Sequence, residues 1–217
     1  MSENPTFILA GNGPYANRGC EAIVRGTVRI LRAFFDDPEF ICCTNYKNED
    51  QFWKQSQEET DNEISHISTY QISKKKIIHN ICKPDIWSST FNYFFRPSAF
   101  RLGIYREMFP YLDRAKAVLS VGGDNYSLDY GEVPTMLTDL DDIVLWKKKP
   151  LVIWGASVGP FDKIPDYEQY MNHHLREVTG IFARESVTIE YLKGIGVTEN
   201  VYPVADPAFL MDPVKPE

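Results

Sequence analysis

Short apolar runs recur along the chain, and most of them end abruptly at glycine or polar residues. Residues 117–121 (AVLSV) are followed by Gly122 and Gly123, and residues 151–154 (LVIW) are followed by Gly155. Runs of this length bounded by glycine are typical of buried strands in a parallel sheet. Similar runs occupy residues 6–10, 40–44, 181–183 and 201–204, and residues 64–70 alternate weakly, which predicts an edge strand.

Between these runs, apolar residues recur at the spacing of a helix. Residues 19–35 carry an apolar stripe, and Asn17 is suited to cap the helix that the stripe predicts. Strands that alternate with helices predict an α/β fold, namely a Rossmann-like three-layer sandwich with a mostly parallel sheet. Further helices are expected within 45–64, as two or three pieces over 74–109, after Pro134, over 166–178 and over 187–193, the last with Ser186 as N-cap and Gly194 as its end.

The turn after the first run carries the first candidate site residues. Gly11, Asn12, Gly13 and Asn17 lie between a strand and a helix. The free N–H groups and the positive dipole end of that helix favour an anionic ligand. The glycine spacing is G-x-G-x5-G, which departs from the G-x-G-x-x-G dinucleotide fingerprint. The turn therefore predicts an anion site and argues against a nicotinamide-dependent oxidoreductase.

A second candidate cluster follows the central run. Gly122 and Gly123 remove side-chain bulk, and Asp124 and Asn125 then present a carboxylate and an amide at the edge of the sheet. Ligands of open parallel sheets bind outside the carboxyl ends of the strands, so we expect a ligand at this turn. The alternative is a tight turn in which Asp124 or Asn125 caps the next helix.

Ser157 and Arg184 follow two later runs. Ser157 lies among small residues after residues 151–154, and Arg184 leaves the tip of residues 181–183. An arginine in this place can bind a carboxylate or a phosphate through two hydrogen bonds. The alternative is an ion pair between Arg184 and Glu185 or another local acid.

Two other groups of charged or titratable residues suggest no site. Arg25, Arg29 and Arg32 share one face of the predicted first helix, which is typical of a solvated surface. His173 and His174 point in different directions and lack clustered cysteine or carboxylate ligands, so we expect no metal site there.

Composition narrows the class of protein. The 217 residues, 43% of them hydrophobic, suffice for one α/β domain or two small ones. A net charge of -7 argues against nucleic acid as a main partner. We expect neither a membrane span, which needs about 20 apolar residues, nor a signal peptide. A reducing cytoplasm is indicated by four cysteines that form no C-x-x-C pair, namely Cys20, Cys42, Cys43 and Cys82.

Four segments of the chain together resemble the polysaccharide pyruvyl transferase family. They occur in one order: GNGPYANRGCEAI at 11–23, SVGGDNYS at 120–127, WGASVGP at 154–160, and ARESVTIEYLKGIGV followed by VADPAFL within 183–210. The resemblance implies two Rossmann-like domains that face each other across a cleft, as in GT-B glycosyltransferases. It also implies transfer of a pyruvyl group from phosphoenolpyruvate to sugar hydroxyls, usually as a ketal on a surface polysaccharide or its precursor.

The chain departs from the family pattern in three ways. Cys20 stands where the family usually has an aspartate before Glu21, and Asp124 stands where it usually has a third glycine. Family members also continue into a second domain, whose histidine-containing motif is thought to supply acid catalysis. We therefore expect residues 1–205 to form the N-terminal domain and residues 206–217 to be a linker-like tail. The chain alone is expected to be weak or inactive in catalysis.

The resemblance further implies roles and partners. Arg184 would bind the anion of phosphoenolpyruvate, with the two glycine turns and Ser157 lining the site, and no residue is assigned as the general acid. No cofactor is expected beyond this donor substrate. The expected partners are the small-molecule donor and a saccharide acceptor, without nucleic acid or a membrane span. A separate C-terminal half and a homo-oligomer stay open as further partners.

Two other functions fit the same fold. One is the N-terminal half of a GT-B glycosyltransferase, whose donor would be a sugar nucleotide. The other is a non-catalytic module that binds sugars or anions, or a degenerate copy that pairs with another chain. Thermal stabilisation by phosphoenolpyruvate, compared with UDP- or GDP-sugars, distinguishes the two transferases.

Overall fold

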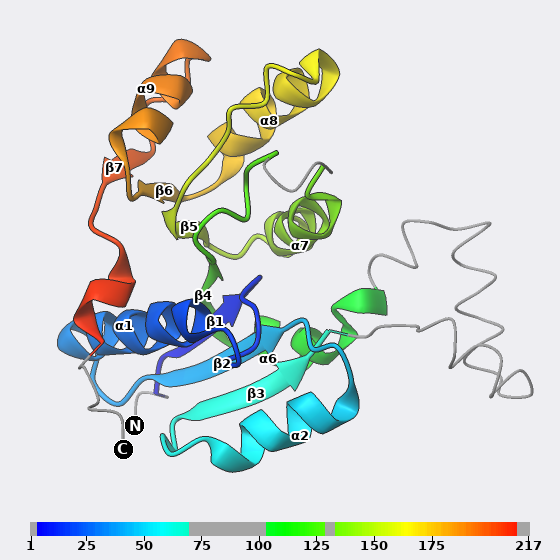
Figure 1. Ribbon diagram of the computed structural model, residues 1–217, viewed down its shortest axis with the longest axis vertical. Helices are drawn as coiled ribbons and strands as arrows, with labels where there is room; N and C mark the ends of the chain where they lie inside the picture. Colours follow the sequence, from blue (N-terminus) through cyan, green and yellow to red (C-terminus); the bar gives the residue numbers. More distant parts are fainter. Residues whose placement is uncertain (1–3, 70–102, 129–132, 212–217) are drawn as a thin grey trace, which may run out of the picture.

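A seven-stranded parallel sheet forms the centre of the protein (Figure 1). The computed structural model describes residues 4–69, 103–128 and 133–211. The strands lie in the order β3-β2-β1-β4-β5-β6-β7, so the direction of strand addition reverses between β1 and β4. Their bounds are β1 (Thr6–Ala10), β2 (Glu39–Thr44), β3 (Ile64–Ser68), β4 (Ala115–Val121), β5 (Leu151–Ala156), β6 (Gly180–Ala183) and β7 (Val201–Pro203).

Helices connect the strands and cover both faces of the sheet, which confirms the predicted three-layer α/β fold. Parallel strands require such crossovers, because each chain segment must return to the same edge of the sheet before the next strand. The helices are α1 (Arg18–Phe34), α2 (Glu49–Glu58), α6 (Phe109–Leu112), α7 (Thr135–Trp146), α8 (Pro165–Glu177) and α9 (Ser186–Gly194), with 3-10 turns η1 (Arg106–Met108) and η2 (Pro207–Leu210).

Alternate residues of the central strands supply two separate cores. Phe7 and Leu9 of β1 pack with the buried face of α1, whereas Ile8 and Ala10 pack on the opposite side. That second core receives apolar residues from α6, α7, α8 and α9. The alternation follows from the pleat of a strand, which directs neighbouring side chains to opposite faces. Burial on both faces explains why these strands read as continuous apolar runs.

Helix ends follow the predicted signals in one place and differ in another. The side chain of Asn17 accepts a hydrogen bond from the backbone N–H of Gly19, as predicted for the cap of α1. The prediction that Ser186 caps α9 is wrong, because Ser186 is already the first helical residue and Glu185 occupies the N-cap position. The predicted helices within 74–102 lie outside the described residues.

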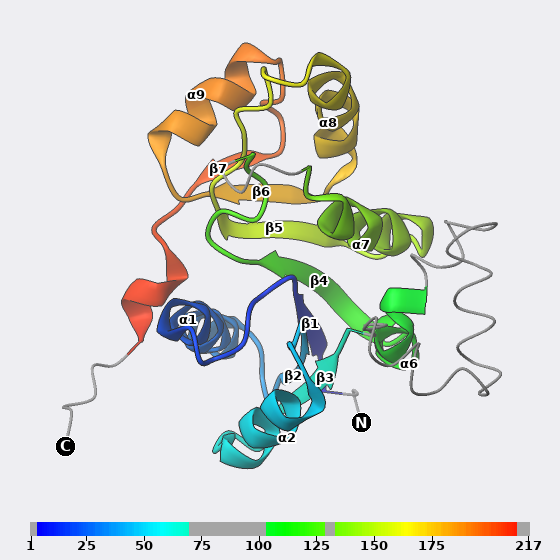
Figure 2. The same ribbon diagram turned by 45° about the vertical axis from the view of Figure 1, so that its right-hand side comes forward.

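The last described segment returns from the edge of the sheet to its middle. Residues 206–211, which we call the strap, contain η2, and both ribbon views show η2 beside α1 (Figures 1 and 2). The approach is close, since a Cβ atom added to Gly26 of α1 would lie 1.8 Å from the carbonyl oxygen of Pro207. A glycine at position 26 therefore permits the contact between α1 and the strap. Whether a second domain follows residue 205 stays a prediction.

Candidate anion site at the centre of the sheet

The predicted site residues lie at the carboxyl ends of β1, β4, β5 and β6. Strands β1 and β4 are neighbours at the point where the strand order reverses. Connections leave β1 and β4 in opposite directions there, and α/β proteins commonly bind their ligands at such a point of reversal. The structure thus places the two glycine turns at the edge where the fold favours a ligand.

The first turn combines a glycine in a left-handed conformation with a buried amide. Gly11 has φ +84°, a left-handed conformation that glycine adopts without steric cost. Asn12 is buried and donates from Nδ2 to the carbonyl oxygen of Cys20 at 2.8 Å. Its Oδ1 is buried and has no hydrogen-bond donor among the described residues. Asn17 lies at the far end of the turn and is exposed, with its side chain engaged in capping α1.

The second turn is joined directly to the first. Asn125 donates from Nδ2 to the carbonyl oxygen of Gly11 at 2.8 Å and to that of Val121 at 3.1 Å. The amide fills the space beside Gly122, where a Cβ would lie 2.0 Å from Asn125 Nδ2. The capping alternative for Asn125 is not what the structure shows, since Pro134 is the N-cap of α7. Asn125 instead holds the two turns together.

Arg184 lies across the second turn. A Cβ added to Gly123 would lie 2.6 Å from Nη1 and 3.1 Å from Cζ of Arg184, so the guanidinium rests on the glycine backbone. Nε donates to Ser157 Oγ at 3.1 Å, and the backbone N–H of Ser157 donates to the carbonyl of Gly123 at 2.7 Å. Ser157, Arg184 and Gly123 therefore lie together at this edge of the sheet.

The local acid that pairs with Arg184 is Asp206. Arg184 Nη1 donates to Asp206 Oδ2 at 2.8 Å, and the two side chains are 27% and 21% exposed. The pair leaves Nη2 of Arg184 without an acceptor among the described residues, and Nη2 lies 3.0 Å from the position of a Cβ added to Gly123. Sequence reasoning missed Asp206, although its place before Pro207 marks it as a cap of the following turn.

Cys20 and Asp124 belong to the same edge of the sheet. Burial raises the pKa of the Cys20 thiol, a backbone hydrogen bond from Gly13 lowers it, and the nearby carboxylate of Asp124 raises it further, with a net upward shift. A thiol with a raised pKa is a poor nucleophile at neutral pH, because only the thiolate attacks. Cys20 therefore lines the site as an uncharged thiol.

A buried network of polar side chains supports the second turn through Tyr126. The Tyr126 hydroxyl lies 2.8 Å from Ser120 Oγ and 2.9 Å from both carboxylate oxygens of Asp141. His174 Nε2 lies 3.0 Å from Asp141 Oδ2. Burial raises the pKa of Tyr126 well above its ordinary value, so its hydroxyl stays protonated. The network ties β4, the second turn, α7 and α8 together.

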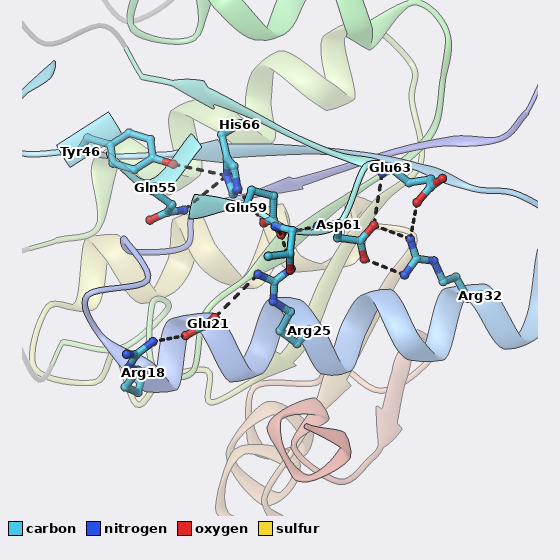
Figure 3. Close-up of polar contacts among 11 residues, drawn as sticks. Arg18, Glu21, Arg25, Arg32, Tyr46, Gln55, Glu59, Asp61, Glu63 and His66 are labelled. Carbon is cyan, nitrogen blue, oxygen red and sulfur yellow. Dashed lines mark hydrogen bonds and ion pairs between the residues drawn. The ribbon is translucent and has the colours of Figure 1, made fainter. Parts of the chain in front are cut away.

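A second charged cluster supports the first turn. The expected solvated face of α1 is present at Arg29 and Arg32, which are exposed, but the arginines of this face also contact neighbouring segments. Figure 3 shows arginine side chains of α1 directed toward the segment between α2 and β3. Arg25 Nη1 donates to Glu59 Oε1 at 2.6 Å, and Arg32 binds both oxygens of Asp61 at 2.7 Å. Arg29 Nη1 donates to the carbonyl oxygen of Leu210 in the strap at 2.9 Å. These arginines tie α1 to its neighbours.

Glu59 connects this cluster to the first turn through His66. His66 Nε2 lies 2.9 Å from Glu59 Oε2, and its Nδ1 lies 3.3 Å from Gln55 Nε2. Gln55 Oε1 in turn accepts from the backbone N–H of Tyr15 at 2.7 Å. Burial acts to raise the pKa of Glu59, but hydrogen bonds from His66 and Arg25 lower it to about 2. The Glu59 carboxylate is therefore charged. It lies outside the first turn and supports that turn through His66 and Gln55.

The described ranges 4–69, 103–128 and 133–211 hold no group of three or more His, Cys, Asp or Glu side chains placed to bind a metal ion. Every helix in these ranges is too short or too polar to cross a bilayer.

Comparisons with known proteins agree with this architecture. A sequence model described as polysaccharide pyruvyl transferase matches residues 17–217. The chain belongs to the polysaccharide pyruvyl transferase family. The amylovoran biosynthesis protein AmsJ of Erwinia amylovora is 28% identical over 216 residues, which cover 94% of this chain and 49% of AmsJ. The chain thus spans about half the length of this curated relative.

The solved structures that resemble this chain show a likeness in fold alone. UGT71G1 of Medicago truncatula, in complex with UDP-glucose, matches with a TM-score of 0.51 and 11% identity over 94% of this chain and 52% of that one. UGT2 of Phytolacca americana matches with a TM-score of 0.48 and 11% identity, over 93% of this chain and 54% of that one. The first match confirms the expected likeness of this chain to one half of a GT-B enzyme.

Proposed function

We propose that this chain supplies the anion-binding half of a pyruvyl transferase that uses phosphoenolpyruvate as donor. The acceptor would be a sugar of a surface polysaccharide or its precursor, modified as a ketal. The observation that carries the proposal is the guanidinium of Arg184, which lies on Gly123 at the point where the strand order reverses. Family membership supports the reaction class, and the absence of a side chain at Gly123 lets the guanidinium approach the backbone of the second turn.

Each part of the site suits a part of this donor. Arg184 has Nη2 available for a carboxylate or a phosphate, groups that match the planar donors of a guanidinium. The first turn presents the N-terminal end of α1, a helix of 17 residues, and this end favours negative charge. The buried Oδ1 of Asn12 is an acceptor for a hydroxyl group of a bound ligand or water.

In the proposed reaction, this chain binds the donor, and a general acid elsewhere supplies the proton. An acid protonates the methylene carbon of phosphoenolpyruvate, and one sugar hydroxyl adds to the adjacent carbon. A second hydroxyl then displaces phosphate from that carbon, which closes the ketal. We assign the acid to the half of the family proteins that this chain does not span. His66 and His174 are not candidates, because both are buried and engaged with carboxylates.

Cysteine usage supports a cytoplasmic setting for this donor. Cys20, Cys42 and Cys43 are free thiols, as expected for a protein in a reducing compartment.

Ligand binding tests the donor assignment. We expect phosphoenolpyruvate to raise the melting temperature of the wild-type chain, and UDP-glucose to leave it unchanged. Arg184→Ala should weaken phosphoenolpyruvate binding at least tenfold, since a charge-assisted pair is worth about 1.5–3 kcal/mol. Arg176→Ala removes an exposed arginine of α8 and serves as the matched control. Stabilisation by UDP-glucose instead would favour the glycosyltransferase.

A phosphate-release assay tests the reaction itself. The chain is incubated with phosphoenolpyruvate and nucleotide- or lipid-linked sugars, alone and together with a C-terminal half of the family. Phosphate release that requires the second half would support a site shared between two halves. Release by the chain alone would overturn the assignment of the acid to the other half. Donor binding without release in either mixture would favour a non-catalytic module.

A further inference from the structure

One carboxylate connects Arg184 to the strap. Asp206 Oδ2 accepts from Arg184 Nη1 at 2.8 Å, and Asp206 Oδ1 accepts from the backbone N–H of Ala208 at 2.9 Å. The second contact caps η2, the 3-10 turn that forms most of the strap. The orientation of the arginine and the start of η2 therefore depend on the same side chain.

The strap has little freedom to shift while it stays seated. Pro207 is buried, and its ring lies 2.5 Å from the position of a Cβ added to Gly155. On the other side, its carbonyl oxygen lies 1.8 Å from a Cβ added to Gly26. Arg29 holds the far end of the strap through the carbonyl of Leu210. Because packed protein contacts resist gradual deformation, the strap is either seated on α1 or displaced.

The guanidinium is fixed by two anchors from different elements. Ser157 follows β5 and accepts from Nε, whereas Asp206 follows β7 and accepts from Nη1. One hydrogen bond leaves a guanidinium free to rotate about its long side chain, but two of them set its plane. If Asp206 moves away, the guanidinium of Arg184 loses one of its two anchors and no longer keeps a fixed orientation on Gly123.

We propose that Asp206 is a positioning residue that couples anion binding at Arg184 to the seating of the strap on α1. The identity of the anion as phosphoenolpyruvate rests on the proposed function, whereas the coupling rests on the contacts of Asp206 alone. A coupling of this kind acts in both directions. Displacing the strap weakens anion binding, and removing Arg184 loosens the strap.

A variant remote from Arg184 tests the first direction. Gly26→Ala places a methyl group where the strap sits, and it touches no group of the anion site. We expect about tenfold weaker binding of both phosphoenolpyruvate and inorganic phosphate, a typical size for coupling between sites. Asp206→Ala should speed exchange of the strap amides as much as Gly26→Ala does, and the double variant no further, because both changes break one connection. Gly194→Ala, with open space around its Cβ, is the control and should bind normally.

Amide hydrogen exchange tests the second direction without any ligand. The amides of Ala208, Phe209 and Met211 are all hydrogen-bonded within the strap. We expect Arg184→Gln to speed their exchange at least fivefold, while Arg176→Gln leaves it unchanged. If Gly26→Ala does not fold, Asp206→Asn takes its place. Asparagine keeps an oxygen that can cap η2, but its amide nitrogen replaces the oxygen that accepts from Arg184.

The outcomes separate the coupling from the donor assignment. Normal anion binding by Gly26→Ala with faster strap exchange would overturn the coupling, and so would unchanged strap exchange in Arg184→Gln. Binding of phosphate but not of phosphoenolpyruvate, with the same sensitivity to Gly26→Ala, would retain the coupling and reject the donor. Failure of the wild-type chain to bind either anion would reject both.

Discussion

Asn125 and Gly11 are separated by 114 positions in the chain, and a single hydrogen bond of 2.8 Å joins them across the centre of the sheet. The donor is a side-chain amide of the second glycine turn, and the acceptor is a backbone carbonyl of the first. Both turns follow central strands, β1 and β4, which pair in register with Leu9 opposite Leu119. The two halves of the candidate site are therefore one structural unit even without a ligand.

Asn125→Ala should destabilise the protein and weaken anion binding more than the loss of stability explains. The change leaves the carbonyls of Gly11 and Val121 without their side-chain donor, which costs about 1–3 kcal/mol of unfolding free energy. Urea denaturation measures this loss, and calorimetry measures binding of phosphoenolpyruvate. Asn62→Ala, at an exposed position, is the control. Equal stability of Asn125→Ala and wild type would show that the hydrogen bond is dispensable.

Gly122→Ala should destabilise the second turn. Gly122 has φ +149°, which side chains rarely adopt, and its added Cβ would overlap Asn125 Nδ2 at 2.0 Å. We expect a loss on the order of 2–4 kcal/mol in unfolding free energy, from backbone strain together with displacement of Asn125. Gly194→Ala lacks both problems and should stay within about 0.5 kcal/mol of wild type. A well-folded Gly122→Ala of normal stability would contradict the geometry of this turn.

His174→Gln should be more destabilising at pH 6 than at pH 9. Burial acts to lower the pKa of His174, but Asp141 and Asp142 raise it overall, so folding favours the charged imidazole. Burial also raises the pKa of Asp141, partly offset by His174. For His174, the folded state binds more protons than the unfolded state between the ordinary and the raised pKa, so its contribution declines as pH rises through that window.

The measurement is the difference in urea midpoint between wild type and His174→Gln across this pH range. His173→Gln changes the exposed neighbour on the same helix and controls for a general effect of histidine loss. A difference that grows toward pH 9 would mean that the buried pair is favoured in its neutral form.

Glu59→Gln should lower stability at neutral pH by an amount that disappears in acid. The pKa of Glu59 is lowered to about 2, so its charged form is favoured in the folded protein. The contribution is complete above the ordinary pKa near 4.5, is lost as pH falls toward 2, and is on the order of 3 kcal/mol at pH 7. Acid unfolding of the two proteins, with exposed Glu58→Gln as control, checks this window. A constant difference from pH 7 to pH 2 would contradict it.

Much of the fold could be predicted from the sequence because its signals are local. Apolar runs predicted the seven strands to within a few residues, and a stripe at helical spacing with Asn17 before it predicted α1 and its cap. The prediction of a cap at Ser186 was also wrong for a local reason, because Ser186 is already the first helical residue of α9. Glycine-rich turns after apolar runs also placed three pieces of the candidate site at one edge, because parallel strands end together.

Tertiary structure alone decided which side chains meet. Arg184 pairs with Asp206, which lies 22 positions further along, and not with its neighbour Glu185. The arginines of α1 bind acids between α2 and β3, and His174 binds Asp141 from another helix. Such contacts join residues whose spacing carries no periodic signal, and strand order brings them together. The sequence by itself determined the elements and the chemistry at their ends; the packing of the sheet and the return of the strap determined the partners.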